Sequence, residues 1–556
     1  MNRTKQIFFA LFVILVLGTF LRFYHITTVP PSLSHDEVAI AYNAYSILKT
    51  GKDEYGKPYP LLFRSFDDYK LSGMVYASIP AVALFGKTAM GARFTSAFLG
   101  SLTILLVYLL VVELMANNQS RSSYRQIHNP HLYALASAFF FAISPWHINF
   151  SRQLFESNGA LFFITLATYL LLKSQKTIYF LLLSSFLFGI SVYFYYSVRL
   201  VIPFIVLSYF LVNKKQLLLN KTIVIISAII FLTSVFPVAR LMFSKEGLER
   251  VNIVSLVNDP NYYKWKDIFA KRYAKNQNIL NKIFFNQKTA LVMTVFDNYW
   301  KNISPLHVFS NGTTTYGLQH PFEIPFIFIG ILFFMTYPNP FKWILILWFA
   351  AAFLPGALST NQPNALRTLL GSPFLSICSG IGAVEVFFSM EKSNRFRFGI
   401  VPFGLLFIFF FYAFYQSYFI VNPTRNSLAF GDGYEQMIRY VKSHEVLYDR
   451  VVISGYYWRP YIFMLYWGDT NPALFQREGT RSGWGKYAFT GAGWDKNEVF
   501  LKDPSYDPKQ LMGSSSDKTL FILASDEYEN NLQRYQQLDV ISGRHAPAVF
   551  IAAVLK

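Results

Sequence analysis

The sequence predicts an α-helical membrane protein with many spans, followed by a small α/β domain. Of the 556 residues, 53% are hydrophobic and only 15% are charged, whereas soluble domains carry about 25% charged residues. The apolar residues gather in runs close to the roughly 20 residues that a bilayer-spanning helix needs. After Asn422-Pro423 the composition turns polar, which marks the start of a soluble domain.

Eleven runs are apolar and long enough to span a bilayer. The first follows Arg3 and Lys5 and has no small-residue cleavage site after it, so we expect an uncleaved span. Residues 177–213 form two spans, broken around residues 193–199. The short run 74–85 contains Pro80 and is expected to be interfacial or re-entrant. The nine single spans are 7–24, 92–115, 132–149, 155–172, 222–240, 322–338, 341–355, 366–389 and 398–420.

The basic residues predict the orientation of these spans. With 74–85 left out of the count, all short basic connections fall on the same side as Arg3 and Lys5, which the positive-inside rule makes cytoplasmic. The first loop (25–91), the long loop (241–320) and the C-terminal domain then face outward. We therefore expect a transmembrane domain over 1–420 in a cell membrane and an extracytoplasmic domain over 421–556.

Charge and cysteine content exclude some classes of protein. The whole net charge of +19 lies in residues 1–420, while residues 421–556 are neutral. A soluble nucleic-acid-binding domain would itself be basic, so nucleic acid is not an expected partner. The single cysteine, Cys378, rules out intramolecular disulfides. The long loop is basic around residues 264–275, which predicts either an interfacial helix or a surface that attracts lipid phosphate.

The C-terminal domain has the pattern of a small α/β fold. Residues 434–444 read as an amphipathic helix, and residues 450–454, 519–524 and 548–555 read as strands. Gly431-Asp432-Gly433 is expected to be a helix-start turn. The sequence has no phosphate-binding loop, dinucleotide fingerprint, zinc-binding histidine pair or internal repeat, and it predicts no metal site.

Carboxylates are rare before residue 420 and gather in the first loop. Six of the sixteen Asp and Glu residues in that part lie in residues 25–91. Asp36 and Glu37 begin an expected helix directly after the first span. A carboxylate there can cap the helix, or it can act as a general base near hydrocarbon. Asp67 and Asp68 come just before Lys70, which can reach along the interface to water or bind a phosphate.

A second acidic position lies between two spans, on the predicted outer side. Arg152 and Glu156 are four residues apart, so they form either a helix ion pair or part of a reaction site. Arg199 follows a tyrosine cluster, and Arg367 follows the helix-breaking stretch that begins at Pro355. Each arginine can extend to the membrane surface or clamp phosphate oxygens with two hydrogen bonds.

Taken together, these motifs resemble the C-type (GT-C) integral-membrane glycosyltransferases, in the branch of protein O-mannosyltransferases and lipid A aminoarabinose transferases. The resemblance covers about residues 1–420. It rests on the acidic pair and the lysine of the first loop, and on three further stretches: Leu84-Phe85-Gly86 with Gly91-Ala92-Arg93-Phe94, Ser144-Pro145 with Ser151-Arg152 and Glu156, and Pro355 with Ala365-Leu366-Arg367.

The resemblance implies transfer of one sugar from a polyprenyl monophosphate to an acceptor hydroxyl, with inversion at the anomeric carbon. It implies that Asp36 is the general base and that Glu156 is the second acidic residue. Lys70, Arg367 and Arg199 would bind the donor phosphate, with Glu37, Asp68 and Arg152 in support. It implies no obligatory cofactor, although a divalent cation near the carboxylates is possible. The expected partners are the lipid-linked donor, a glycan, lipid or protein acceptor, and the bilayer.

Two other functions fit the same sequence features. One is a transporter or flippase of lipid-linked sugars, which would be expected to show internal repeats and ionisable residues at mid-membrane depth. The other is a glycan polymerase or ligase that uses a polyprenyl diphosphate. The acids cluster at the predicted outer boundary and no repeat is visible, so transfer from a monophosphate is the leading hypothesis.

Overall fold

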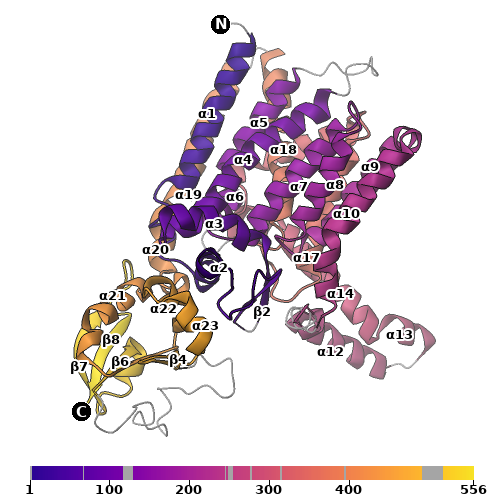
Figure 1. Ribbon diagram of the computed structural model, residues 1–556. Helices are drawn as coiled ribbons and strands as arrows, with labels where there is room; N and C mark the ends of the chain where they lie inside the picture. The colour runs from indigo at the N-terminus through magenta and orange to yellow at the C-terminus, as the bar shows by residue number, and fades with distance from the viewer. Residues whose placement is uncertain are drawn as a thin grey trace. The chain divides into compact units, whose positions relative to one another are not determined.

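The computed structural model describes residues 3–66, 68–116, 129–244, 246–247, 255–275, 278–312, 316–392, 396–490 and 518–556 (Figure 1). Asp67 and the predicted connection with Arg121 and Arg125 lie outside these residues. The chain divides into two compact units. A helical unit comprises Met1–Tyr24, Phe66–Gly73 and Ser96–Tyr415, and a mixed unit comprises His25–Ser65, Met74–Thr95 and Gln416–Lys556.

The helical unit holds most of the long apolar helices. In the described residues, six helices are long and apolar enough to cross a membrane, a bent pair makes a seventh, and five shorter apolar helices accompany them. The protein is therefore a polytopic α-helical membrane protein. The main helices are α1 (Arg3–Phe23), α4 (Ala89–Ala116), α5 (Pro130–Ile143), α6 (Pro145–Ser151), α7 (Glu156–Lys173), α8 (Phe180–Ser191), α9 (Val198–Leu219), α10 (Lys221–Met242), α15 (Ile324–Thr336), α16 (Lys342–Ala352), α17 (Leu354–Ala357), α18 (Ser372–Lys392) and α19 (Phe396–Tyr415).

Most predicted spans match a helix, with one correction. The predicted break within residues 177–213 is confirmed, because α8 ends at Ser191 and α9 begins at Val198. The predicted continuous span over 132–149 is wrong. Helix α5 ends at Ile143, and Pro145 begins the short helix α6, which is bent by 116° from α7. Proline has no N–H to donate and crowds the preceding turn, which favours a helix break at this position.

Small residues allow the helices around α18 to pack closely. Helix α18 packs against α5 and α15. A Cβ on Gly380 would lie 2.3 Å from the backbone nitrogen of Ser137 on α5, and a Cβ on Gly330 of α15 would lie 2.1 Å from the carbonyl oxygen of Cys378. Backbones that approach this closely gain van der Waals contact that bulky side chains would prevent. These glycines therefore fix the centre of the helical unit.

Three helices of the long loop stand apart from the bundle of α5, α7, α8 and α18 in Figure 1. They are α12 (Pro260–Lys275), α13 (Ile279–Phe284) and α14 (Gln287–Ile303), and they follow the short helix η1 (Leu256–Asn258). Helices α12 and α14 pack on each other around Tyr262, Phe269 and Ala290. The prediction of a helix in the basic part of this loop is confirmed.

The mixed unit contains a six-stranded sheet in the order β4-β5-β3-β6-β8-β7. Strand β3 pairs in parallel with β5 and β6, and the other pairs are antiparallel. Its elements include α2 (His35–Thr50), β1 (Leu62–Ser65), α20 (Asn422–Arg425), α21 (Tyr434–His444), β3 (Arg450–Ile453), α22 (Pro460–Trp467), α23 (Pro472–Glu478), β4 (Gly483–Trp484), β5 (Tyr487–Phe489), β6 (Thr519–Ala524), α24 (Ser525–Glu529), β7 (Tyr535–Ile541) and β8 (Phe550–Leu555). Strand β2 (Asp68–Leu71) belongs to the helical unit, and α3 (Gly73–Phe85) lies almost wholly in the mixed unit.

The sequence pattern explains why these elements form. Helix α21 buries Tyr434, Met437, Ile438 and Val441, which lie on one helical face. Every residue of β6 is buried, as expected for an inner strand covered on both faces. The turn before α21 is held by Asp432, whose carboxylate accepts the backbone N–H groups of residues 544 and 545, both at 2.8 Å. The predicted small α/β fold of the C-terminal segment is confirmed.

Candidate active site

The acidic pair of the first loop begins helix α2 in the mixed unit. Ser34 is the N-cap, and its hydroxyl oxygen accepts the N–H of Glu37 at 3.4 Å. The Glu37 carboxylate in turn accepts the backbone N–H of Ser34 at 3.0 Å, which completes a capping box. The cap is therefore made by Ser34 and Glu37, and the capping interpretation applies to Glu37.

Glu37 is also one half of a buried ion pair with Arg93. Both side chains are fully buried, and Nε and Nη2 of Arg93 donate to the two carboxylate oxygens at 2.9 and 3.2 Å. Nη1 of Arg93 donates to the carbonyl oxygens of Ile26 and Pro30, both at 2.9 Å. Removing one partner of such a pair leaves an uncompensated buried charge, which costs about 3–5 kcal/mol. Glu37 thus holds the loop that precedes α2.

Asp36 is the more accessible of the two neighbouring acids. Its side chain is 37% exposed, whereas that of Glu37 is completely buried. The Nε2 atom of His35 lies 3.8 Å from an Asp36 carboxylate oxygen, and the His35 ring stacks on Trp458 with the ring centroids 4.5 Å apart. Asp36 therefore has a histidine and an aromatic surface beside it, within the same unit.

A third carboxylate of the first loop is fully enclosed in the mixed unit. Glu54 is 1% exposed. One of its oxygens accepts the hydroxyl of Tyr461 at 3.2 Å, and the other accepts the side-chain N–H of Asn43 at 3.3 Å. Desolvation by burial raises the pKa of Glu54 from 4.5 to about 7, against the opposing effect of the tyrosine hydrogen bonds. The folded protein therefore favours the neutral carboxyl group.

Glu54 makes stability depend on pH. Between pH 4.5 and about 7 the unfolded chain has lost this proton while the folded chain keeps it, so the free energy of unfolding falls as pH rises through this window. Glu54→Gln keeps the neutral hydrogen-bonding shape. We expect the variant to gain on the order of 3 kcal/mol over the parent between pH 5 and pH 8. Thermal unfolding in detergent at both pH values measures this, with the half-exposed Glu478→Gln as control. Equal pH slopes in Glu54→Gln and parent would contradict the assignment.

Lys70 and Glu156 form an ion pair in the helical unit. Lys70 lies on β2, and its Nζ is 3.6 Å from a carboxylate oxygen of Glu156, with 14% and 11% of the two side chains exposed. Glu156 is the first residue of α7, where the positive end of the helix dipole favours a carboxylate. The structure brings together the predicted phosphate-binding lysine and the predicted second acid.

Tyr196 contacts both the strand that carries Lys70 and the Arg199 guanidinium. Its hydroxyl donates to the carbonyl oxygen of Tyr69, the neighbour of Lys70, at 3.0 Å. The Arg199 guanidinium lies over the Tyr196 ring, 4.8 Å from its centroid. Tyr196 therefore brings Arg199 near the strand that carries Lys70.

Arg367 is held by the irregular segment between α17 and α18. Its Nη1 donates to the Ser359 hydroxyl at 2.6 Å and to the Thr360 carbonyl oxygen at 2.7 Å. Its backbone N–H donates to the Asn364 side chain, and its carbonyl oxygen accepts the Ser197 hydroxyl at 3.1 Å. The predicted helix break falls slightly later than expected, because Pro355 and Gly356 lie in the short helix α17 and the chain leaves the helical conformation after Ala357. The guanidinium is thus fixed by its own loop, and the backbone of Arg367 is held by Ser197 just before α9.

A cavity of about 480 Å³ opens beside Arg367. Its polar lining comes from Arg367, three serines and two tyrosines: Ser197, Ser255, Ser359, Tyr195 and Tyr196. The rest of the wall is mainly apolar and includes Leu200, Leu256, Val257, Leu291, Val295 and Leu358. We call this cavity the Arg367 pocket. A few convergent polar groups in an apolar cavity are typical of a binding site, here for a ligand with an anionic head and an apolar chain.

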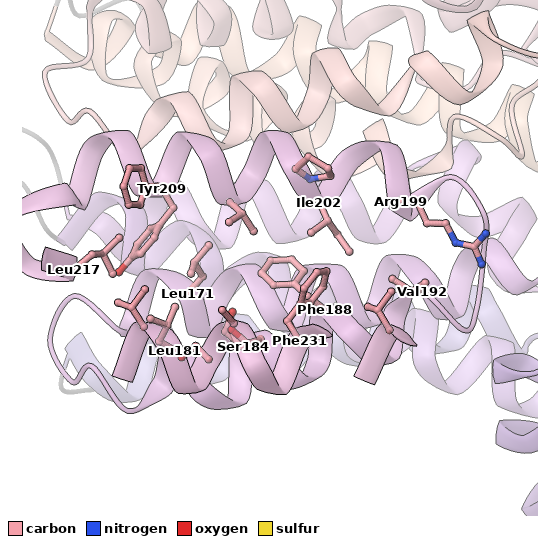
Figure 2. A pocket seen from close by; sticks show the side chains of 18 residues that line it. Leu171, Leu181, Ser184, Phe188, Val192, Arg199, Ile202, Tyr209, Leu217 and Phe231 are labelled. Atoms are coloured by element: carbon pink, nitrogen blue, oxygen red, sulfur yellow. The ribbon is translucent and has the colours of Figure 1, made fainter. Parts of the chain in front are cut away.

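Arg199 belongs to a second cavity, shown in Figure 2. This cavity has a volume of about 540 Å³ and is lined almost entirely by apolar side chains of α8, α9 and α10. Arg199 lies at one end, while Tyr209 and Leu217 lie toward the other (Figure 2). Nη1 of Arg199 lies 2.7 Å from the Met242 sulfur, a weak acceptor, and within the described residues Nη2 is buried without a hydrogen-bond partner. The three predicted phosphate-binding cations therefore have different surroundings.

The remaining predicted residues have structural contacts. Arg152 is fully buried, and its Nη1 donates to the carbonyl oxygen of Leu21 at 2.7 Å. Arg152 follows the end of α6 and Glu156 begins α7 beyond a sharp bend, so the alternative of an ion pair along one helix does not apply. An Asp68 carboxylate oxygen accepts the backbone N–H of Tyr69 at 2.7 Å.

Several residues of the site were missed from the sequence. Tyr196, Ser197 and Ser359 line the Arg367 pocket, and Arg93 neutralises Glu37. The sequence signal that could have identified the three pocket residues was the presence of polar residues within the helix breaks near 196 and 359. No spacing rule connects Arg93 to Glu37 across 56 positions.

The described residues do not form an evident metal centre. Among them, no group of three or more His, Cys, Asp or Glu side chains is close enough to hold a metal ion. The described carboxylates near Lys70 and around α2 instead contact cations or hydrogen-bond donors. A divalent cation at this site stays a prediction.

Comparison with known proteins places the fold. No protein-family model matches the chain, and no curated protein matches it. Among solved structures, ArnT from Cupriavidus metallidurans bound to undecaprenyl phosphate is similar at a TM-score of 0.55 and 10% identity, with 99% of this chain and 98% of ArnT covered. The apo state of the same ArnT gives a TM-score of 0.54 at 10% identity, with 100% and 98% covered.

The chain shares the ArnT fold. The fold that the resemblance implies for about residues 1–420 is thereby confirmed. The archaeal oligosaccharyltransferase AglB from Archaeoglobus fulgidus, in complex with an inhibitory peptide and a dolichol-phosphate, matches at a TM-score of 0.50 and 12% identity, over 84% of this chain. The chain spans only 64% of that AglB chain, and it spans 61% of another structure of the A. fulgidus oligosaccharyltransferase. The similarity to ArnT, in contrast, covers nearly the full length of both chains.

Proposed function

We propose that this protein is an inverting glycosyltransferase that moves a single sugar from a polyprenyl phosphate to an acceptor hydroxyl on the outer face of a cell membrane. The Arg367 pocket carries the proposal, because it combines a fixed guanidinium with an apolar wall. That combination suits a phosphate joined to an isoprenoid chain. The ArnT fold supports it, since a structure with that fold is bound to undecaprenyl phosphate.

The cations have a clear task in this reaction. As the bond between the anomeric carbon and the phosphate oxygen breaks, its electron pair stays with the polyprenyl phosphate, so negative charge grows on that oxygen. Donors already fixed in place stabilise such charge without having to reorganise. Arg367 is fixed by Ser359 and Thr360, and Lys70 is fixed by its pairing with Glu156. We assign Lys70 and Arg367 to the binding of the donor phosphate. We assign Arg199 to the same phosphate, because its guanidinium lies over the ring of Tyr196, which lines the Arg367 pocket.

The acceptor needs a general base. Its hydroxyl oxygen attacks the anomeric carbon from the face opposite the phosphate, and its proton goes to a carboxylate. We assign this role to Asp36, because its side chain is accessible. The Glu37 side chain is buried in its ion pair with Arg93 and in the helix cap. Glu156 is assigned to hold Lys70 in place. The long loop and the α/β domain would then face outward with Asp36, and the N-terminus would be cytoplasmic.

Sugar transfer by the purified protein tests this proposal. The full chain in nanodiscs is given labelled sugars on polyprenyl monophosphates and diphosphates, with a panel of glycan, lipid and peptide acceptors. We expect release of polyprenyl monophosphate and a product of inverted anomeric configuration. Turnover of diphosphate donors alone would favour the polymerase or ligase, and vesicle translocation without a new glycosidic bond would favour the transporter.

A further inference from the structure

Helix α14 is amphipathic in the opposite sense from a helix on a soluble surface. Its residues Thr294, Asn298 and Asn302, spaced four apart, are completely buried. Val292, Phe296 and Trp300, also spaced four apart, are 51%, 67% and 64% exposed. A helix that faces water places its polar stripe outward. The outward apolar stripe of α14 therefore matches an environment of hydrocarbon.

The buried polar stripe is fully engaged inside the unit, so its position is not accidental. The Asn298 side chain donates to the Asp259 carboxylate at 3.2 Å and accepts from Asn261 at 3.1 Å. The Asn302 side chain donates to Gln362 at 2.8 Å and accepts the backbone N–H of Asn364 at 2.9 Å. Rotating α14 to turn its apolar stripe inward would break these bonds and leave buried polar groups unsatisfied.

Helix α13, which precedes α14 in the chain, also exposes apolar side chains. Ile279, Leu280, Ile283 and Phe284 are 56–76% exposed, on a helix of six residues. Single exposed apolar residues are ordinary, but a group of seven on two successive helices marks a surface that contacts another apolar phase. We call the two groups together, Ile279, Leu280, Ile283, Phe284, Val292, Phe296 and Trp300, the apolar ridge.

Charge identifies what the ridge contacts. The three helices carry eight basic residues and only two acidic ones. The two acids, Asp267 and Asp297, are each paired within their own helix to Lys271 and Lys301. An apolar ridge flanked by excess positive charge fits the headgroup and upper acyl region of a leaflet that contains anionic lipid. The basic residues are Lys264, Lys266, Lys271, Arg272, Lys275, Lys282, Lys288 and Lys301.

The same helices form part of the Arg367 pocket. Leu291 and Val295 of α14, and Leu256 and Val257 of η1, line it. Ser255 pairs with Ser359 in an isolated β-bridge, and Asn302 binds the segment that orients Arg367. One surface of α14 thus lines the pocket while another carries the ridge.

We propose that α12, α13 and α14 form a hairpin inserted by its apolar ridge into a leaflet that contains anionic lipid, and that this insertion sets the apolar wall of the Arg367 pocket at the level of the acyl chains. A lipid donor could then enter the pocket sideways from the leaflet. That consequence rests on the proposed function, whereas the insertion itself does not.

Spin-label accessibility tests the insertion without any donor. Cys378 is the single cysteine and is completely buried, so Cys378→Ser gives a clean background. A nitroxide is attached at Phe296→Cys or, in a second variant, at Trp300→Cys. The matched control is Val446→Cys, at an apolar position of the mixed unit that is 87% exposed. Collision rates with oxygen and with a water-soluble nickel chelate are measured in phosphatidylcholine nanodiscs, with and without phosphatidylglycerol.

We expect labels at 296 and 300 to collide severalfold more with oxygen and severalfold less with nickel than the label at 446. We expect the difference to grow when phosphatidylglycerol is present, and to shrink again when Lys264 and Lys266 are both changed to glutamine. Nickel accessibility at 296 and 300 equal to that at 446 would overturn the insertion. Insertion that is independent of phosphatidylglycerol would overturn the role of anionic lipid. Neither result depends on catalysis, so sugar transfer can fail or succeed separately.

Discussion

Replacing Asp36 by asparagine should lower kcat for sugar transfer by about 10²–10⁴-fold, the usual contribution of a general base. Asparagine keeps the size of the side chain but cannot accept the acceptor proton. The start of α2 should survive, because Ser34 and Glu37 make its cap. We therefore expect an unchanged apparent melting temperature together with the loss of turnover, both measured on the same detergent-solubilised sample.

The neighbouring acid supplies the matched control. Glu37→Gln should act mainly on folding, because it leaves the buried Arg93 guanidinium without a charged partner. We expect a clearly lower melting temperature, and a kcat per folded molecule much closer to that of the parent than in Asp36→Asn. Full activity of Asp36→Asn would remove Asp36 from the mechanism. Loss of folding in Asp36→Asn, but not in Glu37→Gln, would reverse the two roles.

Replacing Arg367 by glutamine should reduce kcat/KM by about 10²–10³-fold, which is typical for the loss of one preorganised donor to developing charge. Within the described residues, the hydrogen bonds of the Arg367 side chain both use Nη1. Its Nε and Nη2 are then available to a phosphate in the pocket. Glutamine can still bond to Ser359 or Thr360 but carries no positive charge. Steady-state kinetics with a polyprenyl-phosphate sugar measure the effect.

An exposed arginine gives the comparison for this change. Arg439→Gln removes a 76% exposed guanidinium on α21 that pairs with Glu435. Surface pairs contribute little, so we expect unchanged kinetics and stability. If Arg367→Gln also keeps parental kcat/KM for a phosphate-linked donor, the assignment of Arg367 to the phosphate is wrong.

Strong local signals made much of the fold predictable. The long apolar runs gave the helices of the membrane unit, and the apolar face of residues 434–444 gave α21 with its observed ends. Strand β7 was missed because five of its seven residues are exposed, so the edge strand shows no apolar pattern. The break at Pro145 was missed because hydropathy counts proline within an apolar run without registering its lost hydrogen bond.

The candidate site was predictable in part, for a physical reason. Rare charges next to apolar runs identified Lys70, Glu156 and Arg367, and the structure pairs Lys70 with Glu156. Which partner neutralises which charge depends on tertiary contacts. The Glu37–Arg93 pair and the hydrogen bond from Tyr196 to the backbone of Tyr69 join distant parts of the chain. No regular spacing in the sequence relates such residues, so their pairing can be read only from the three-dimensional structure.

Photo-crosslinking tests most directly where the donor binds. A polyprenyl phosphate with a photoreactive group in its first isoprene unit is irradiated with the full chain in nanodiscs, and the modified residues are mapped by mass spectrometry. We expect labelling at the wall of the Arg367 pocket, at residues 256, 257, 291, 295 and 358, which excess unlabelled polyprenyl phosphate should suppress. Labelling confined to the cavity beside Arg199, at residues such as Phe188, Ile202 or Phe231, would contradict the account.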